Sequence, residues 1–147
     1  MRVLILGAAG MLGHKLCQTY RSRYDTWATV RKSSSNYVEY DLLPADHLIG
    51  GVDAFNIQTV INAMAIIRPD VVINCIGIIK QLKEAKSPIT SITINSLFPH
   101  QLHTLCQASG ARLIHISTDC VFAGHIGMYR EDDIADAEDL YGRSKYL

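Results

Sequence analysis

The chain has 147 residues, a length that suits one domain able to bury a core of its own. Fourteen basic residues balance fourteen acidic ones, and this neutrality argues against a nucleic-acid binder that works through a broad basic face. With 48% hydrophobic and 19% charged residues the composition is typical of a soluble globular protein, and no apolar run reaches the roughly 18 residues of a membrane span.

The amino-terminal segment and the cysteines indicate a reducing compartment. MRVLILGAAG has too short an apolar run and too many glycines for a secretory signal. The cysteines form no C-x-x-C pair, and we interpret all four as free thiols: Cys17, Cys75, Cys106 and Cys120. The cytoplasm is therefore the expected location.

Strand and helix patterns alternate along the first half of the chain. RVLIL predicts a first strand, and a helix is expected over residues 11–23 after a glycine-rich turn. TWATV predicts a second strand, and YVEY predicts a short third one. A helix is expected over residues 55–68 and ends at Pro69, and its apolar stripe consists of Val60, Ile61, Met64 and Ile67.

The alternation continues in the second half. VVINCIG is a continuous apolar run, which predicts a strand buried on both faces. A helical region follows to about Ser109, bends or restarts at Pro99, and ends at Gly110. Its residues at helical spacing are Ile94, Leu97, Phe98, Leu102 and Leu105. RLIHIST predicts a fifth strand, and another helix is expected to open near Glu138.

Strands separated by helices imply right-handed crossovers and a parallel sheet. The predicted fold is therefore α/β, a doubly wound parallel sheet of the Rossmann type with about five strands, in one domain over residues 1–147. Ligands of such sheets bind beyond the carboxyl ends of the strands. The residues that follow LIL, ATV, VIN and HIS are accordingly the candidates for a site.

The first candidate is the glycine-rich turn LILGAAGMLGHKL. Gly7 allows the tight turn, Gly10 lets a pyrophosphate approach the backbone, and Gly13 permits close packing of helix on strand. The helix that begins with Met11 and Leu12 offers its free N–H groups to the phosphates. The spacing G-x-x-G-x-x-G is one residue longer than the G-x-G-x-x-G fingerprint, but its place after the first strand favours a dinucleotide site over a merely structural turn.

The second strand ends in TVRKSS, which bears on the choice of cofactor. An acidic residue there would bind the 2′-hydroxyl of the adenosine ribose and favour NAD(H). Arg31 and Lys32, with the hydroxyl of Ser33, match a 2′-phosphate instead, so NADP(H) is predicted over NAD(H). Two solvated basic residues on a loop are the alternative. Asp41 and Leu42, which follow the third predicted strand, are expected near the adenine.

A metal face is considered for His100, His103 and Cys106, which recur at intervals of three residues. The segment lacks a fourth ligand and already has an apolar stripe of its own. No metal site is predicted.

The fifth strand ends in ISTDCVFAG, and YGRSK follows about twenty residues later. Tyr141 and Lys145 are one helical turn apart, and a tyrosine beside a lysine can serve as a proton donor, although a bare Y-x-x-x-K is common by chance. With the glycine turn, these motifs resemble the extended short-chain dehydrogenase/reductase family over the whole chain. STDCVFAG followed by YGRSK is similar in particular to the dTDP-4-dehydrorhamnose reductases, whose motif reads S-T-D-Y-V-F-x-G.

The resemblance implies a role for each matching residue. Thr118 would hydrogen-bond the substrate carbonyl, and Tyr141 would be the general acid that protonates its oxygen. Lys145 would hold the nicotinamide ribose and favour the tyrosinate. Ser117 and Asp119 would flank the substrate.

Further residues match the family less specifically. Asn74, Gly77 and Asn95 match positions near the cofactor, although an asparagine before an apolar helix is often only a cap. Cys120 replaces a tyrosine that lies by the substrate in the family, which puts the particular sugar in doubt. As no histidine is close in sequence, a packing role is favoured for Cys120 over a nucleophilic one. NCIGIIKQ also differs from the family's alanine-rich N-A-A-A stretch, so a sub-branch with another nucleotide-linked 4-keto sugar is considered.

The implied function is an NADP(H)-dependent reductase of a nucleotide-sugar ketone. An epimerase or dehydratase of the same superfamily is one alternative, and Asp119 keeps the dehydratase open. A non-catalytic NADP-binding regulatory subunit is the other, although such members tend to lose part of the Thr118, Tyr141 and Lys145 set. Family members are about twice as long, so we expect a truncated enzyme that lacks the sugar-binding lobe and is inactive alone. The uncovered sheet edge invites self-association, so a homo-oligomer is considered.

Overall fold

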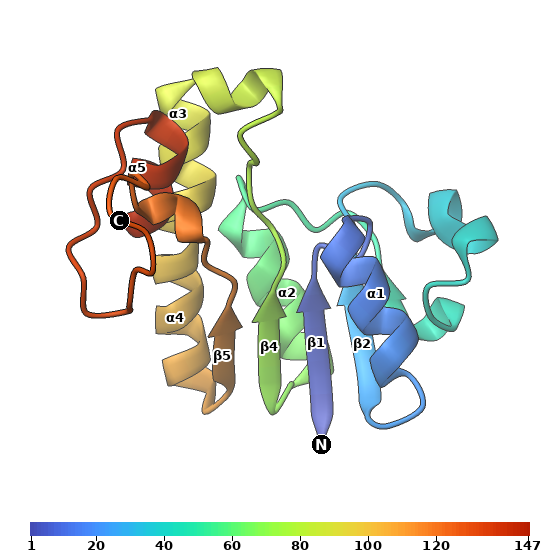
Figure 1. The fold of residues 1–147 in the computed structure, drawn as a ribbon. Helices are drawn as coiled ribbons and strands as arrows, with labels where there is room; N and C mark the ends of the chain where they lie inside the picture. The colour runs from blue at the N-terminus through green and yellow to red at the C-terminus, as the bar shows by residue number, and fades with distance from the viewer. The chain divides into compact units, whose positions relative to one another are not determined.

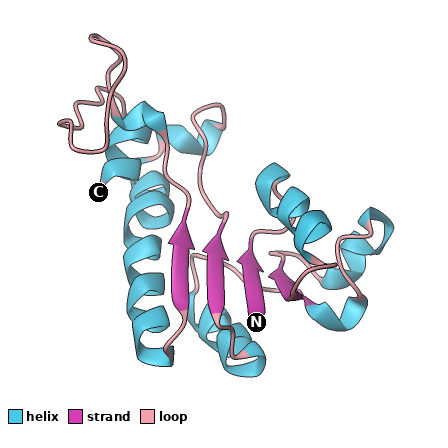
Figure 2. Cartoon of the chain, turned by 60° about the horizontal axis from the view of Figure 1, so that its bottom comes forward, coloured by secondary structure: helices cyan, strands magenta, loops and turns pink.

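The computed structural model describes residues 1–147. It contains a five-stranded parallel sheet in the order β3-β2-β1-β4-β5. The strands are β1 (Arg2–Leu6), β2 (Asp25–Thr29), β3 (Leu48–Ile49), β4 (Val71–Asn74) and β5 (Arg112–His115). The strand arrows point the same way in Figure 2, and the predicted doubly wound α/β fold is confirmed.

Helices connect the strands. The α-helices are α1 (Met11–Tyr20), α2 (Ile57–Ile67), α3 (Pro88–Ser91), α4 (Phe98–Ser109) and α5 (Leu140–Tyr146). The 3-10 helices are η1 (Ser34–Tyr40), η2 (Ala45–His47), η3 (Lys83–Lys86) and η5 (Asp119–Val121), and η4 (Ile92–Leu97) is a π-helix. In Figure 1, α1 lies in front of the sheet and α2 lies behind it. None of these helices has the length and apolar character that a membrane span requires.

The chain forms two compact units. The first, which we call the sheet unit, comprises Met1–Ile76 and His100–Ile116 and holds the five strands, α1, α2 and most of α4. The second, the helical unit, comprises Gly77–Pro99 and Ser117–Leu147 and holds α3, η4, η5 and α5.

The core of the sheet unit is built around β1. Val3 to Leu6 are fully buried because β1 has β2 and β4 as neighbours and helices on both faces. Cys17 of α1 packs into the same cluster. The predicted stripe of α2 is confirmed for Val60, Met64 and Ile67, which are buried, while Ile61 is half-buried.

The predicted strand YVEY is wrong. These residues belong to η1, which begins after Ser33, and the backbone N–H of Asn36 donates to the Ser33 carbonyl. Val38 is 72% exposed and Tyr40 is 61% exposed, and Tyr37 alone packs against the core cluster, so the segment has no alternating apolar face to give to a sheet. The third strand is instead Leu48–Ile49, whose Leu48 is buried beside β2.

The predicted interruption near Pro99 is confirmed, but two residues of the predicted stripe are not fully buried. The N–H of Phe98 donates to the Thr93 carbonyl five residues back, which is the π pattern, and Pro99 follows directly. Leu97 is 50% exposed and Leu105 is half-buried, whereas Cys106 is buried four residues after Leu102 on the same face of α4. Gly110 ends α4 at a φ of +73°, as predicted.

The four cysteines are free, as the sequence predicts. Burial, with a smaller contribution from Cys75, raises the pKa of Cys17 to about 12. Burial raises the pKa of Cys75 to about 11. Both thiols therefore remain protonated at neutral pH and act as small apolar side chains.

Candidate functional site

The glycine turn after β1 has the tight geometry that the sequence predicts. Gly7 has a φ of +86°, a conformation that L side chains rarely adopt, and a Cβ there would lie 2.9 Å from the Ile76 side chain. A Cβ on Gly13 would collide with the backbone of Gly7, because α1 is packed directly against the turn. Both positions are therefore restricted to glycine by the protein's own packing.

Gly10 is different, because the protein leaves room there. It is the N-cap of α1 in an extended conformation, and a Cβ on it would meet only the Gly7 carbonyl oxygen, at 3.4 Å. No side chain caps α1, and Met11 and Leu12 are exposed. The first N–H groups of α1 thus lie open beside an uncrowded backbone, an arrangement that fits the phosphates of a dinucleotide.

A cavity of about 520 Å³ adjoins the glycine turn within the sheet unit. Its lining comes from the turn, α1, the loop after β2 and η1, and consists of Ala9, His14, Lys32, Asn36, Tyr37, Tyr40 and Leu42. Arg31 and Lys32 are exposed, and their side chains make no ion pair. They are free to bind an anionic group.

Asp41 and Leu42, which were predicted near the adenine, both make contacts within the protein. The carboxylate of Asp41 lies 3.0 Å from the Arg21 guanidinium in an exposed ion pair. Leu42 is buried in the core cluster and also reaches the cavity. Both follow η1 and not a strand, so their predicted setting was wrong although Leu42 lines the cavity.

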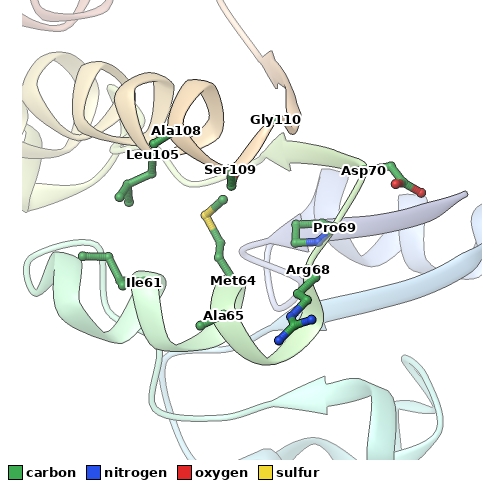
Figure 3. A pocket seen from close by; sticks show the side chains of 10 residues that line it. All are labelled: Ile61, Met64, Ala65, Arg68, Pro69, Asp70, Leu105, Ala108, Ser109 and Gly110. Carbon is green, nitrogen blue, oxygen red and sulfur yellow. The ribbon is translucent and has the colours of Figure 1, made fainter.

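A second cavity in the sheet unit has a volume of about 580 Å³ and lies between α2 and the end of α4. Figure 3 shows Met64 and Leu105 pointing into it, with Arg68 and Asp70 at its rim. The residues that join α2 to β4 and α4 to β5 line it, so it lies at the amino ends of the strands. Ligands of doubly wound sheets bind at the opposite ends, and we therefore place the candidate site at the glycine turn.

Asn74 ends β4 and is fully buried. Its amide nitrogen lies 3.1 Å from Nδ1 of His115 at the end of β5, and its oxygen accepts the N–H of Ile76. The side chain thus fixes the ends of two neighbouring strands. A direct contact of Asn74 with a cofactor stays a prediction.

In the helical unit, Tyr141 and Lys145 lie one turn apart on α5, as predicted. Asp139 caps the helix by accepting the N–H of Gly142 at 2.7 Å. Both Tyr141 and Lys145 are half-buried, and burial lowers the pKa of the Lys145 ammonium. Burial thus leaves the Lys145 ammonium less well solvated than that of an exposed lysine.

The positions between Tyr141 and Lys145 fasten the helix. A Cβ on Gly142 would collide with the Cys120 carbonyl oxygen, so α5 and η5 are in close contact. Ser144 is 1% exposed, accepts from the amide of Asn95 at 3.2 Å, and its carbonyl accepts from the Ser96 hydroxyl at 2.6 Å.

Asn95 is not a helix cap. It lies inside η4, is 2% exposed, and its amide group exchanges two hydrogen bonds with the backbone of Ile78 while also donating to Ser144. Gly77 lies beside it, and a Cβ there would be 3.6 Å from the Asn95 oxygen. Asn95 therefore joins the loop after β4 to α5, and this support could not be foreseen from its local sequence.

The predicted substrate residues lie in η5 and just before it. The hydroxyl of Thr118 caps η5 by accepting the Cys120 N–H at 3.2 Å and donates to the Asp119 carboxylate at 3.3 Å. Ser117 and Cys120 are exposed. The residues from Ser117 to Cys120, which follow β5, thus lie together at the turn that contains η5.

A cavity of about 410 Å³ opens beside η5 within the helical unit. Its lining is Asp119, Cys120, Phe122, Gly124, Gly127, Met128 and Tyr129. The Phe122 and Tyr129 rings stack at 4.5 Å between centroids. Sequence reasoning selected Asp119 and Cys120 but gave no role to the aromatic pair, although Phe122 belongs to STDCVFAG and Tyr129 follows that motif.

Comparison with known proteins gives one consistent family. The model of the RmlD substrate binding domain family matches residues 1–147. Methionine adenosyltransferase 2 subunit beta of Danio rerio is 30% identical over 149 residues, covering 98% of this chain and 41% of that protein. dTDP-4-dehydrorhamnose reductase of Streptomyces griseus is 30% identical over 145 residues, covering 98% of this chain and 42% of that protein.

A solved structure agrees with these relatives. The crystal structure of dTDP-4-dehydrorhamnose reductase from Bacillus anthracis in complex with NADP is 29% identical, with a TM-score of 0.79. The match covers 99% of this chain and 46% of that one. The chain thus spans less than half the length of these three proteins.

Proposed function

The chain belongs to the RmlD substrate binding domain family, and from this we propose that the protein carrying it reduces the 4-keto group of a nucleotide-linked deoxysugar with NADPH. The observation that carries the proposal is α5. It presents Tyr141 and Lys145 one turn apart, while Gly142 and Ser144 between them are fully used in packing. The likeness to a dTDP-4-dehydrorhamnose reductase supports the same reaction class.

The sheet unit would bind the cofactor, which supplies a hydride when bound. Gly10 and the open N–H groups of α1 would hold the pyrophosphate. Arg31 and Lys32 would bind the 2′-phosphate of the adenosine ribose, because both cations are unpaired and no carboxylate follows β2 directly. The NADP in the Bacillus anthracis structure supports this choice.

The helical unit would supply the proton. Thr118 would turn its hydroxyl proton from the Asp119 carboxylate to the ketone oxygen, and Tyr141 would give its phenolic proton to that oxygen as the carbonyl carbon accepts the hydride. Lys145 would stabilise the resulting tyrosinate through its positive charge. The cavity beside η5 would take the deoxysugar, with Cys120 at the position that distinguishes this chain from the family motif.

We expect the chain to bind NADPH more tightly than NADH, and Arg31→Asp to narrow or reverse that preference. The new carboxylate would repel the 2′-phosphate and accept the 2′-hydroxyl of NADH, which changes the relative affinity by roughly tenfold or more, as for the loss of a charged hydrogen bond. Fluorescence titration of Trp27, in the middle of the strand that leads into this loop, measures both affinities. Equal affinity for the two cofactors in the unmutated chain would refute the 2′-phosphate assignment.

The function itself is tested by supplying NADPH and a panel of 4-keto nucleotide sugars to the full protein and to the 147-residue chain. Oxidation of NADPH with formation of the hydroxy sugar by the full protein is the expected result. The chain alone should bind NADPH without turnover. Turnover by the chain at a comparable rate would show that its residues suffice for catalysis.

Two other functions have support. The likeness to a protein named as a subunit of methionine adenosyltransferase 2 favours a non-catalytic NADP-binding subunit as the second candidate. An epimerase or dehydratase of the same superfamily is the other, and the Asp119 carboxylate, which accepts from Thr118, favours the dehydratase of these two. A panel assay distinguishes them, because an epimerase or dehydratase changes the sugar without net oxidation of NADPH and a subunit does neither.

A further inference from the structure

The carboxylate of Asp139 makes two contacts at the start of α5. Its Oδ1 accepts the backbone N–H of Gly142 at 2.7 Å and so caps the helix. Its Oδ2 lies 2.5 Å from Nζ of Lys80, which belongs to the loop between β4 and η3. This ion pair therefore ties a distant loop to the first turn of the helix that carries Tyr141.

A tether at this point matters because α5 is short. A helix of seven residues has little stability of its own in water, so its orientation depends on outside contacts. The contacts of Gly142 and Ser144 fix the helix after Tyr141, whereas those of Asp139 fix it before. Tyr141 lies between these anchor points, and loss of the leading one frees the first turn.

Asp139 and Lys80 interact differently with the start of α5, because their charges are opposite. The first turn of a helix carries a partial positive charge, so Lys80 would be repelled by it if Asp139 were absent. The Gly142 hydrogen bond and then Lys80 lower the pKa of Asp139, while the Asp139 contact raises the pKa of Lys80. The pair thus stays ionised on both sides of neutral pH.

We propose that Lys80 and Asp139 are positioning residues for proton transfer, holding the first turn of α5 so that the Tyr141 phenol stays aimed at the oxygen bound by Thr118. This inference rests on the proposed function for its chemical consequence. The tether itself rests only on contacts within the helical unit. Neither residue is assigned a contact with the reacting atoms.

The first test of the Lys80–Asp139 tether uses NMR to measure the amide hydrogen exchange rates of Gly142 and Arg143 in the 147-residue chain. Lys80→Met should speed exchange about two- to fivefold, the range that an ion pair exposed to solvent supplies. Lys80→Arg should restore the slow rate. Lys83→Met is the matched control, because Lys83 is an exposed lysine of the neighbouring η3 without an ion pair.

Asp139→Ser separates the ion pair from the cap, because serine caps helices well but cannot pair with Lys80. Adding Asp139→Ser to Lys80→Met should give no further increase in exchange, since the two changes remove one interaction. Additive effects, or unchanged exchange in Lys80→Met, would overturn the tether.

The catalytic consequence is tested in the full protein with NADPH and the sugar that it reduces. Lys80→Met should lower kcat about three- to tenfold, leave the affinity for NADPH and the shape of the pH profile unchanged, and be rescued by Lys80→Arg. Faster exchange with unchanged kcat would overturn the positioning role. Absence of any turnover by the unmutated protein, with the exchange result as expected, would instead refute the proposed function and leave the tether standing.

Discussion

Tyr141→Phe should lower turnover of the full protein by about 10²–10⁴, the contribution of a general acid placed at the reacting oxygen. The change deletes only the phenolic hydroxyl, so the ring packing of α5 and the affinity for NADPH should survive. The helix α5 is held through Asp139, Gly142 and Ser144 and not through the Tyr141 hydroxyl, so deleting that hydroxyl should leave α5 in place. Steady-state kinetics with a nucleotide-linked 4-keto sugar measures the loss.

The matched control for this variant is Tyr146→Phe. Tyr146 belongs to the same helix and follows Lys145 directly, but it is 64% exposed. The Tyr146→Phe variant should keep full turnover. Equal rates for Tyr141→Phe and Tyr146→Phe would mean that YGRSK is only a structural helix.

The pH dependence of turnover should reflect Lys145. Because burial lowers the pKa of Lys145 from its ordinary 10.5, we expect activity to fall on the alkaline side at a lower pH than an exposed lysine would give.

The central strands could be predicted because a short continuous apolar run fits a strand that is buried on both faces of a sheet. RVLIL and the start of VVINCIG have neighbours on both edges, and their burial follows from this. YVEY failed because β-branched and aromatic residues favour a strand only where a sheet accepts them. The real third strand has two residues, Leu48 and Ile49, too few for any periodicity.

In the candidate site, too, some features could be predicted from the sequence and others could not. Gly7, Gly13 and the pair Tyr141 and Lys145 follow local spacing rules, so their arrangement could be predicted from the sequence. Their supports could not, because the partners are far apart in the chain.

Asn95 shows the difference. Its hydrogen bond to Ser144 joins residues 49 positions apart, and no local pattern encodes such a contact. The Lys80 and Asp139 pair is of the same kind.

Gly10→Ala should weaken NADPH binding about five- to 150-fold while leaving the fold nearly as stable as before. A Cβ at Gly10 meets only the Gly7 carbonyl oxygen, at 3.4 Å, so the protein itself can accept it. A pyrophosphate lying on the backbone cannot, and forcing a methyl group into a close contact costs about 1–3 kcal/mol. Isothermal titration with NADPH, beside urea unfolding of the same variant, measures the two quantities.

Gly13→Ala is the comparison that makes this result specific to the cofactor. Its Cβ collides with the backbone of Gly7, so the free energy of unfolding should fall by about 1–3 kcal/mol or more even without a ligand. One glycine is thus required by the fold, and the other by what the turn binds. If Gly10→Ala binds NADPH as tightly as the unmutated chain, no pyrophosphate lies over Gly10, and the glycine turn serves only to pack α1 against β1.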